Sequence, residues 1–248
     1  MVLSAMPIGE FDKRLVILTR EMGKISVFAK GARRPNSALL ACSQPLVFAE
    51  FSLYAGRSAY NLAAAEVKNY FEELREDFEG LCYAFYFCEF SEYITRENND
   101  EREILKLLYQ SLRALAKKSI DRQLIKLIFE LKIIALSGEA PQVFECVRCK
   151  SKAAQTNDNE AASGFYFSAA SRGILCRACS GAYRGARAIN TSTLYAMQYI
   201  IAKETEKLYT FTVSLPVLEQ LKGCIGSYLA NFTDHEFKSL AMLNSISP

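Results

Sequence analysis

Two pairs of cysteines constrain this chain more than any other feature of its sequence. Cys146 and Cys149 form one CxxC pair, Cys176 and Cys179 form the other, and 26 residues separate the pairs. Each CxxC turn directs two thiolates at one point, so two turns complete a tetrahedral shell of four sulfurs. The pattern predicts a structural Zn²⁺ site, because a four-thiolate shell leaves no position for water or substrate.

A CxxC pair is also the signature of a thiol–disulfide oxidoreductase, in which one exposed thiol of low pKa attacks a disulfide. Two pairs so close together fit that alternative less well. The remaining cysteines are predicted to be small buried apolar side chains. They are Cys42, Cys82, Cys88 and Cys224. The chain shows no secretory signal and no apolar run of 18 residues, so we expect a cytoplasmic protein with reduced thiols and no membrane partner.

Alternating apolar residues fill the first part of the chain. The segments RLVILT at 14–19, KISVFA at 24–29 and PLVFAEFSLY at 45–54 each read as a β-strand. The first two are joined by REMGK, a hairpin connection in which Gly23 can take a positive φ. Short strands with two distinct faces favour a small closed barrel, and a sandwich of two sheets fits the same pattern.

Helical periodicity replaces this alternation from about Leu62 onward. Two segments carry apolar residues at spacings of three and four, which predicts one buried face on each helix. These residues are Tyr83, Phe87, Phe90 and Ile94 in the first, and Ile104, Leu108, Leu112 and Leu115 in the second. Residues 124–136 are apolar nearly all round, which predicts a central helix ending near Gly138.

The cysteine pairs lie in a segment of different character, which interrupts the helical part. Residues 142–187 contain a polar tract and the hairpin-like segment GFYFSAASRGIL, and helical patterning returns after Ala188. We therefore expect an α+β protein with a barrel at 1–64, a helical domain at 65–141 and 188–248, and a zinc-binding segment at 142–187.

Charge is segregated along the chain, although its formal net charge is only +3. Residues 1–60 carry 8 cationic against 4 anionic side chains, residues 61–145 carry 11 against 16, and residues 146–187 carry 7 against 2. Two basic regions that flank an acidic one indicate a polyanionic partner that is bound by particular surfaces.

Between Lys13 and Arg34 there are seven cations and one anion, Glu21. Loops and strand ends of a small barrel share a rim, so we expect these cations to gather there and to contact phosphates. The predicted contacts are Arg14, Arg20, Lys24, Lys30, Arg33 and Arg34. Phe28, Tyr54 or Tyr60 could offer a stacking surface to bases. A second phosphate surface could comprise Arg148, Lys150, Arg172, Arg177, Arg184 and Arg187.

The common catalytic signatures are absent. The sequence contains no GxxxxGK[ST], GxGxxG or HExxH, and its one histidine, His235, has no nucleophile elbow to pair with. We therefore expect a binding protein and not an enzyme.

Several segments together resemble the RecO family of bacterial recombination mediators. They are GEFDKRLVILTREMGKISVFAKGARRPNS, FELKIIALSGEAP, ECVRC, FYFSAASRGILCRAC and FKSL, and they occur in the family's order across essentially the whole chain. The resemblance implies an N-terminal oligonucleotide-binding (OB) fold barrel, followed by an α-helical domain that carries a zinc-binding insertion.

The resemblance also implies a function in DNA repair and recombination. The expected activities are binding of single- and double-stranded DNA, annealing of complementary strands, and loading of the recombinase onto DNA covered by single-strand-binding protein, together with RecR. The expected location is the cytoplasm, in association with the nucleoid. A zinc-containing transcription regulator is a further alternative, but the sequence contains no recognition-helix signature.

Overall fold

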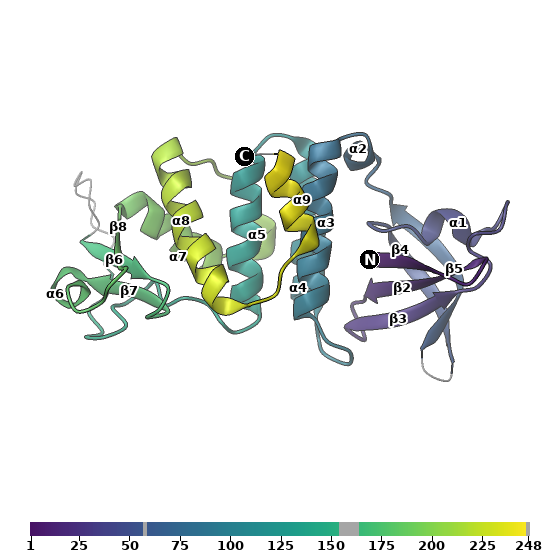
Figure 1. Cartoon of the computed structure of the whole chain (residues 1–248), viewed down its shortest axis with the longest axis horizontal. Helices are drawn as coiled ribbons and strands as arrows, with labels where there is room; N and C mark the ends of the chain where they lie inside the picture. The colour runs from purple at the N-terminus through teal and green to yellow at the C-terminus, as the bar shows by residue number, and fades with distance from the viewer. Residues whose placement is uncertain (57–58, 154–163, 247–248) are drawn as a thin grey trace. The chain divides into compact units, whose positions relative to one another are not determined.

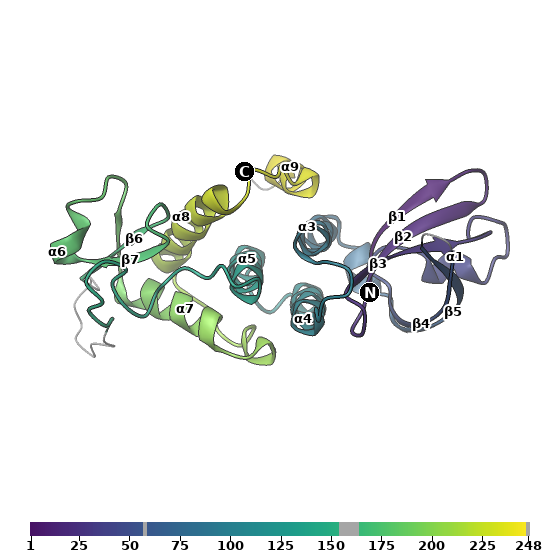
Figure 2. The same cartoon turned by 90° about the horizontal axis from the view of Figure 1, so that it is seen from below.

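The computed structural model describes residues 1–56, 59–153 and 164–246, and its elements are shown in Figures 1 and 2. The chain divides into two compact units. The first unit is Met1–Lys118 with Glu236–Pro248, and the second is Ser119–His235. The domain boundaries expected from the sequence, at 64, 141 and 187, stay a prediction.

The first unit begins with a five-stranded sheet whose strand order is β1-β2-β3-β5-β4. The strands are β1 (Val2–Ile8), β2 (Asp12–Leu18), β3 (Lys24–Ala29), β4 (Phe48–Ala55) and β5 (Tyr60–Asn69). All neighbouring pairs are antiparallel except β3 and β5, which are parallel, and the short helix α1 (Leu39–Cys42) lies between β3 and β4 in the chain. This is the arrangement of a partly open OB-type barrel.

The sheet curls so far that β1 contacts Leu46 and Val47, the two residues just before β4. The N–H of Val2 donates to the carbonyl of Val47, and the N–H of Leu46 donates to the carbonyl of Val2, both at 2.9 Å. No continuous ladder joins β1 to β4 in the described residues, so the expected closed barrel is only partly closed. Alternate residues of β2 and β3, such as Leu15 and Val27, are fully buried and form the core of the curled sheet.

Two strands were not expected from the sequence. The strand β1 was not predicted, and β5 was predicted to be helical from about Leu62 onward. That prediction is wrong, because residues from Tyr60 to Asn69 pair with β4 along their length. The segment AAAEVKN contains good helix formers, but pairing with β4 and burial of alternate side chains override that local preference.

The helices of the first unit are α2 (Glu72–Arg75), α3 (Phe78–Ile94), α4 (Arg102–Lys117) and α9 (Lys238–Ile246). The predicted apolar faces are confirmed: on α3, Tyr83, Phe87 and Phe90 are buried and Ile94 is half-buried, and the four residues predicted on α4 are buried. The helix α9 packs along α3 (Figure 2). Its start is held by Glu89, whose carboxylate accepts hydrogen bonds from the N–H groups of Lys238 and Ser239.

The predicted hairpin between β2 and β3 is confirmed, and its turn touches the loop between α3 and α4. The N–H of Lys24 donates to the carbonyl of Arg96 at 3.0 Å, and the N–H of Asn98 donates to that of Met22 at 3.0 Å. Gly23 has φ +63°, and a Cβ there would collide with the carbonyl oxygen of Arg96. Glycine is therefore required both by its conformation and by this close approach.

The second unit contains α5 (Arg122–Leu136), α7 (Thr191–Ala202), a 3₁₀ turn η1 (Thr205–Lys207) and α8 (Leu215–Phe232). As predicted, α5 is central: it packs against both α7 and α8 and is buried on nearly all sides. Lys132 is buried on α5, where its ammonium donates to the carbonyls of Ile201 and Lys203 at 3.0 and 2.6 Å. A buried cation is thus used to satisfy the carboxyl end of α7.

A small sheet completes the second unit. It has the order β7-β6-β8, with β6 (Phe165–Ser168), β7 (Gly173–Cys176) and β8 (Arg187–Ile189), and the short helix α6 (Arg177–Ser180) follows β7 directly. The hairpin predicted from GFYFSAASRGIL is therefore confirmed. Across the described ranges, no helix has the length and hydrophobicity needed to cross a membrane.

Candidate metal centre and nucleic-acid interface

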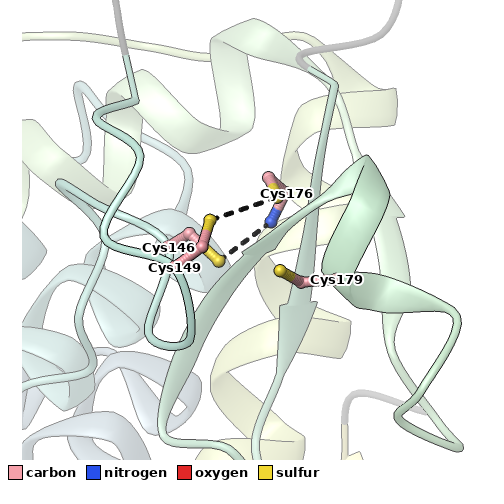
Figure 3. Close-up of side chains that lie close together, drawn as sticks. All are labelled: Cys146, Cys149, Cys176 and Cys179. Carbon is pink, nitrogen blue, oxygen red and sulfur yellow. Dashed lines mark hydrogen bonds between the residues drawn. The ribbon is translucent and has the colours of Figure 1, made fainter.

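The first cysteine pair lies on a tight turn after α5. The N–H of Lys150 donates to the carbonyl of Cys146 at 3.0 Å, and the N–H of Cys146 donates to the carbonyl of Ser151 at 2.8 Å. Lys150 closes the turn with φ +62°. This backbone path brings the side chains of Cys146 and Cys149 to the same side of the turn (Figure 3).

The second pair is positioned by the β6–β7 hairpin. Cys176 is the last residue of β7, paired with Phe165, and Cys179 lies one helical turn later on α6. The N–H of Cys176 points at the first pair and lies 3.4 Å from the sulfur of Cys146 (Figure 3). A strand end and a helix start therefore aim two thiols at the turn that carries the other two.

The four sulfur atoms all lie within 4.8 Å of one another, and those of Cys149 and Cys176 are 3.6 Å apart. Four thiolates around one metal ion at about 2.3 Å would be separated by about 3.8 Å. The quartet therefore fits a closed tetrahedral metal site. Its apolar surroundings are small: among the described residues, the cluster contains buried Leu175 besides Cys146 and Cys179, with Val147, Phe165 and Ala186 partly buried against it.

The environment separates the pKa values of the four thiols. A hydrogen bond from Ser151, followed by its backbone N–H and the neighbouring thiols, lowers the pKa of Cys149 to about 6. Burial opposes ionisation of Cys146, but backbone N–H donors, including that of Cys176, outweigh it and lower its pKa. The hydrogen bond with Cys176, followed by desolvation, raises the pKa of Cys179 to about 12. Hydrogen bonds from Ser151 and from backbone N–H groups thus already favour thiolates in the first pair.

Three of the predicted phosphate contacts lie together at one end of the curled sheet. Lys30, Arg33 and Arg34 are exposed on the loop between β3 and α1, and no carboxylate in the described residues forms an ion pair with them. The loop folds onto the turn between β1 and β2, where the N–H of Gly31 donates to the carboxylate of Asp12 at 2.7 Å. Gly31 has φ +68°, as its tight path requires.

Two of the predicted contacts lie at the other end of the same strands. Residue pairing places Lys13 opposite Ala29 and Leu18 opposite Lys24, so Lys24 is roughly 17 Å along the strands from the basic loop. Arg20 is in the adjoining turn, where it pairs with Glu21 at 2.7 Å. The prediction that all these cations share one rim is therefore wrong, because a hairpin carries its two ends to opposite edges of the sheet.

The remaining cations of this region have different environments. Arg14 is exposed on the outer face of β2, where its guanidinium donates to the hydroxyl of Ser26 at 3.2 Å. Lys13 is buried and donates to the carbonyl and the hydroxyl of Ser43 at 3.2 Å. Burial, followed by the charge of Arg33, lowers the pKa of Lys13. Lys13 therefore binds Ser43 inside the fold, whereas the side chain of Arg14 faces outward.

The second basic region is also divided by the structure. Lys150 pairs with Glu145 at 3.0 Å, and Arg172 pairs with Glu139. Arg148 is exposed between the first two cysteines, and Arg177 is exposed between the second two. Arg184 and Arg187 are also exposed. Arg148 and Arg177 therefore lie next to the cysteines in the sequence, whereas the guanidinium of Arg187 lies beside Gly223 of α8.

An aromatic residue beside the basic loop, Phe11, was not predicted from the sequence as a stacking residue. Phe11, in the turn between β1 and β2, is 36% exposed, and the guanidinium of Arg34 lies 5.3 Å from its ring centroid. Of the predicted stacking residues, Tyr54 is 52% exposed on β4, whereas Phe28 and Tyr60 are half-buried. The sequence signal that could have indicated Phe11 is an aromatic ring in a turn, directly before Asp12.

Comparison with known proteins identifies relatives over nearly the whole chain. Residues 1–71 match the family model "Recombination protein O N terminal", and residues 75–241 match "Recombination protein O C terminal". The protein named "DNA repair protein RecO" from Alkaliphilus metalliredigens is 36% identical over 239 residues, which are 96% of this chain and 94% of the relative. Its namesake from Acetivibrio thermocellus is 30% identical over 246 residues, 99% and 95% of the two chains. The chain therefore belongs to the recombination protein O family, as its sequence motifs predicted.

Proposed function

We propose that this protein is a DNA-binding mediator of repair and recombination that acts without catalysing a reaction. It binds single- and double-stranded DNA, anneals complementary strands and helps to load the recombinase onto DNA covered by single-strand-binding protein. The names of its relatives support a function in DNA repair. The observation that carries the proposal of direct DNA contact is the group of three exposed cations with no ion-pair partner in the described residues, Lys30, Arg33 and Arg34.

We call the loop that carries these three cations, together with Arg14, the basic loop surface. The six contacts predicted from the sequence are narrowed to these four residues, since Arg20 is paired with Glu21 and Lys24 lies at the far end of the strands. Phosphate contacts of this kind bind DNA of any sequence and release condensed counterions. Binding should therefore be insensitive to sequence and should weaken steeply with salt.

Annealing follows from the same electrostatics. Two complementary strands repel each other through their phosphates, and cations that neutralise part of this charge lower the repulsion. Because phosphate contacts leave the base edges free, the strands can still pair. The exposed arginines near the thiol quartet, among them Arg177 and Arg184, are candidates for a second phosphate surface, so that two strands could be held at once.

The metal in the cysteine quartet is proposed to be Zn²⁺ with a structural role. Four thiolates in this spacing suit zinc, and a closed shell leaves no site for substrate. The ion would hold together a segment whose apolar core is small. The thiol–disulfide oxidoreductase alternative depends on a metal-free pair instead. Metal analysis separates the two: one zinc bound per chain supports the mediator, and a metal-free protein that reduces disulfides supports the enzyme.

The partners proposed from the family resemblance are RecR, single-strand-binding protein and, indirectly, the recombinase. The proposed location is the cytoplasm, at the nucleoid. No surface of the described residues is assigned to any of these proteins.

The proposed DNA contact is tested by titrating a labelled oligonucleotide with the wild-type protein and with R33A/R34A at several salt concentrations. Each lost phosphate contact should lower the slope of log K against log salt by about 0.9, so the double variant should lose about 1.8. At 0.1 M salt this corresponds to roughly 50-fold weaker binding. The control is R20A, which removes a paired cation at the other end of the strands. An unchanged slope in R33A/R34A would contradict the proposed contact.

A further inference from the structure

The turn between β1 and β2 and the basic loop are joined into one rigid feature. The N–H of Arg33 donates to the carbonyl of Phe11 at 2.8 Å, and its guanidinium reaches the carbonyl of Gly9 at 3.4 Å. The carboxylate of Asp12 accepts from the N–H of Gly31 at 2.7 Å. These contacts fix the backbone of Phe11 beside the cations, so its side chain has a defined place on the basic loop surface.

The ring of Phe11 is exposed where a polar side chain would be expected. Turns usually carry polar residues, but this ring is 36% exposed and the guanidinium of Arg34 lies over it. Two further apolar side chains are exposed on the preceding strand: Ile8 is 39% exposed and Met6 is 64% exposed. Exposed apolar groups beside unpaired cations are what a partner with flat apolar faces and negative charges would require.

The register of the strands extends this character across the sheet. Met6 pairs with Arg14, and Arg14 pairs with Phe28, so the three residues form one row across β1, β2 and β3. The neighbouring residues Leu15 and Val27 point into the core, so this row faces outward. A thioether, a guanidinium and a phenyl ring thus stand side by side on the outer face, on the strands that lead to the basic loop.

We infer that Phe11, with Arg34 over its ring, is a stacking platform for an unpaired base, and that it gives this surface a preference for single-stranded over double-stranded nucleic acid. The inference rests on the proposed DNA binding and deepens it. An unpaired base can place its face on an aromatic ring, whereas the bases of a duplex are already stacked on their neighbours. Lys30 and Arg33 stand on the same loop, where they can contact the phosphates that flank such a base.

A purely structural role for Phe11 makes a different prediction. If the ring served only to hold Arg34 in place, its removal would misplace a phosphate contact. Single-stranded and duplex DNA would then be weakened equally, because both present phosphates. If the ring stacks on bases, the loss is confined to single strands. The comparison of the two substrates therefore separates the two roles.

The experiment compares F11A, F11L and F11W with the wild-type chain. The probes are a fluorescent oligo-dT and a hairpin duplex of the same charge, titrated at one fixed salt concentration and then over a salt series. F11A and F11L should bind oligo-dT roughly 5- to 150-fold more weakly. Duplex binding should stay within about twofold, with an unchanged salt slope, because no phosphate contact is lost. F11W should bind oligo-dT at least as tightly as the wild type, since it keeps a flat aromatic face.

The matched control is F78A, which removes an exposed aromatic side chain from the start of α3. It should leave both affinities unchanged. F11L keeps apolar volume in the turn, so it tests the ring itself if F11A proves unstable to heat. Equal weakening of both substrates, or no weakening of oligo-dT binding, would overturn the role of Phe11 while leaving the proposed function intact. A wild-type chain that binds neither substrate at low salt would overturn both.

Discussion

The two basic regions of the chain, 13–34 and 146–187, are held in place by different physical means. The first is built on the curled sheet, where a cluster of fully buried apolar residues such as Leu15, Ile17 and Val27 fixes the strands and hence the loops. The second surrounds four thiols with little apolar core of its own. A charged surface needs a rigid support, and this chain supplies one by apolar burial and the other, we propose, by a metal ion.

Both regions nevertheless divide their cations in the same way. In the first, Lys13 is buried, Arg20 is paired with Glu21, and Lys24 donates to the carbonyl of Glu92. Arg14 and Arg33 also donate to protein groups, but their side chains stay exposed. In the second, Lys150 and Arg172 are paired with glutamates. The other cations face outward. A count of positive charge along the sequence therefore overstates the charge that is available to a partner. The burial and the ion pairs of each side chain show how much of that charge is accessible.

The largest expected effect is that of metal removal, which should damage only the second region. Binding of structural zinc contributes on the order of 10 kcal/mol in small motifs, which is more than the few apolar contacts around the quartet can replace. Chelation should make residues 142–153 and 164–189 sensitive to protease while the sheet of β1 to β5 stays resistant. The measurement is limited proteolysis with mass spectrometry, alongside the metal content.

A matched control for metal removal is C224S, which changes a buried cysteine outside the quartet. That variant should retain its metal and its protease resistance at 142–153 and 164–189. If the chelated protein were cleaved no faster than the untreated one, the quartet would not be the support of this region.

The next effect sharpens the difference between the turn that joins β2 to β3 and the turn that joins β1 to β2. Both Gly23 and Gly9 have positive φ, but a Cβ at Gly23 would collide with Arg96, and a Cβ at Gly9 would meet nothing within 4 Å. G9A should cost about 1 kcal/mol from backbone strain alone. G23A should cost at least twice as much, because the α3–α4 loop must also move away. Urea unfolding measures both, and equal losses would mean that the close approach carries no weight in stability.

The smallest effect separates a structural cation from a binding cation. The ammonium of Lys24 donates to the carbonyl of Glu92 at 2.5 Å, in the last turn of α3, whereas Lys30 has no such partner among the described residues. K24M should lower the free energy of unfolding by about 1 kcal/mol and leave DNA binding unchanged. K30M should do the reverse, with the salt slope lower by about 0.9. If K24M and K30M weakened DNA binding equally, the position of a cation along the hairpin would have no influence on DNA binding.

Local signals predicted much of this fold. The periodicity of α3, α4 and α5 was readable because apolar residues at spacings of three and four must share one face. The hairpin at Gly23 and the β6–β7 hairpin were readable from glycine and alternation. The strand β5 was not, because its alanine-rich segment is helical by propensity and becomes a strand only through its pairing with β4.

The sequence by itself determined the chemistry of the chain: four thiols in two CxxC turns, two basic regions and the family motifs that led to recombination protein O. These are properties of residue type and spacing, which do not depend on distant contacts. Only the tertiary structure decided which cations remain available, because Lys24 and Arg20 differ from Arg33 and Arg34 in their neighbours and not in their charge. It also placed Phe11 beside Arg34, since two loops that are distant in sequence meet only when the sheet has formed.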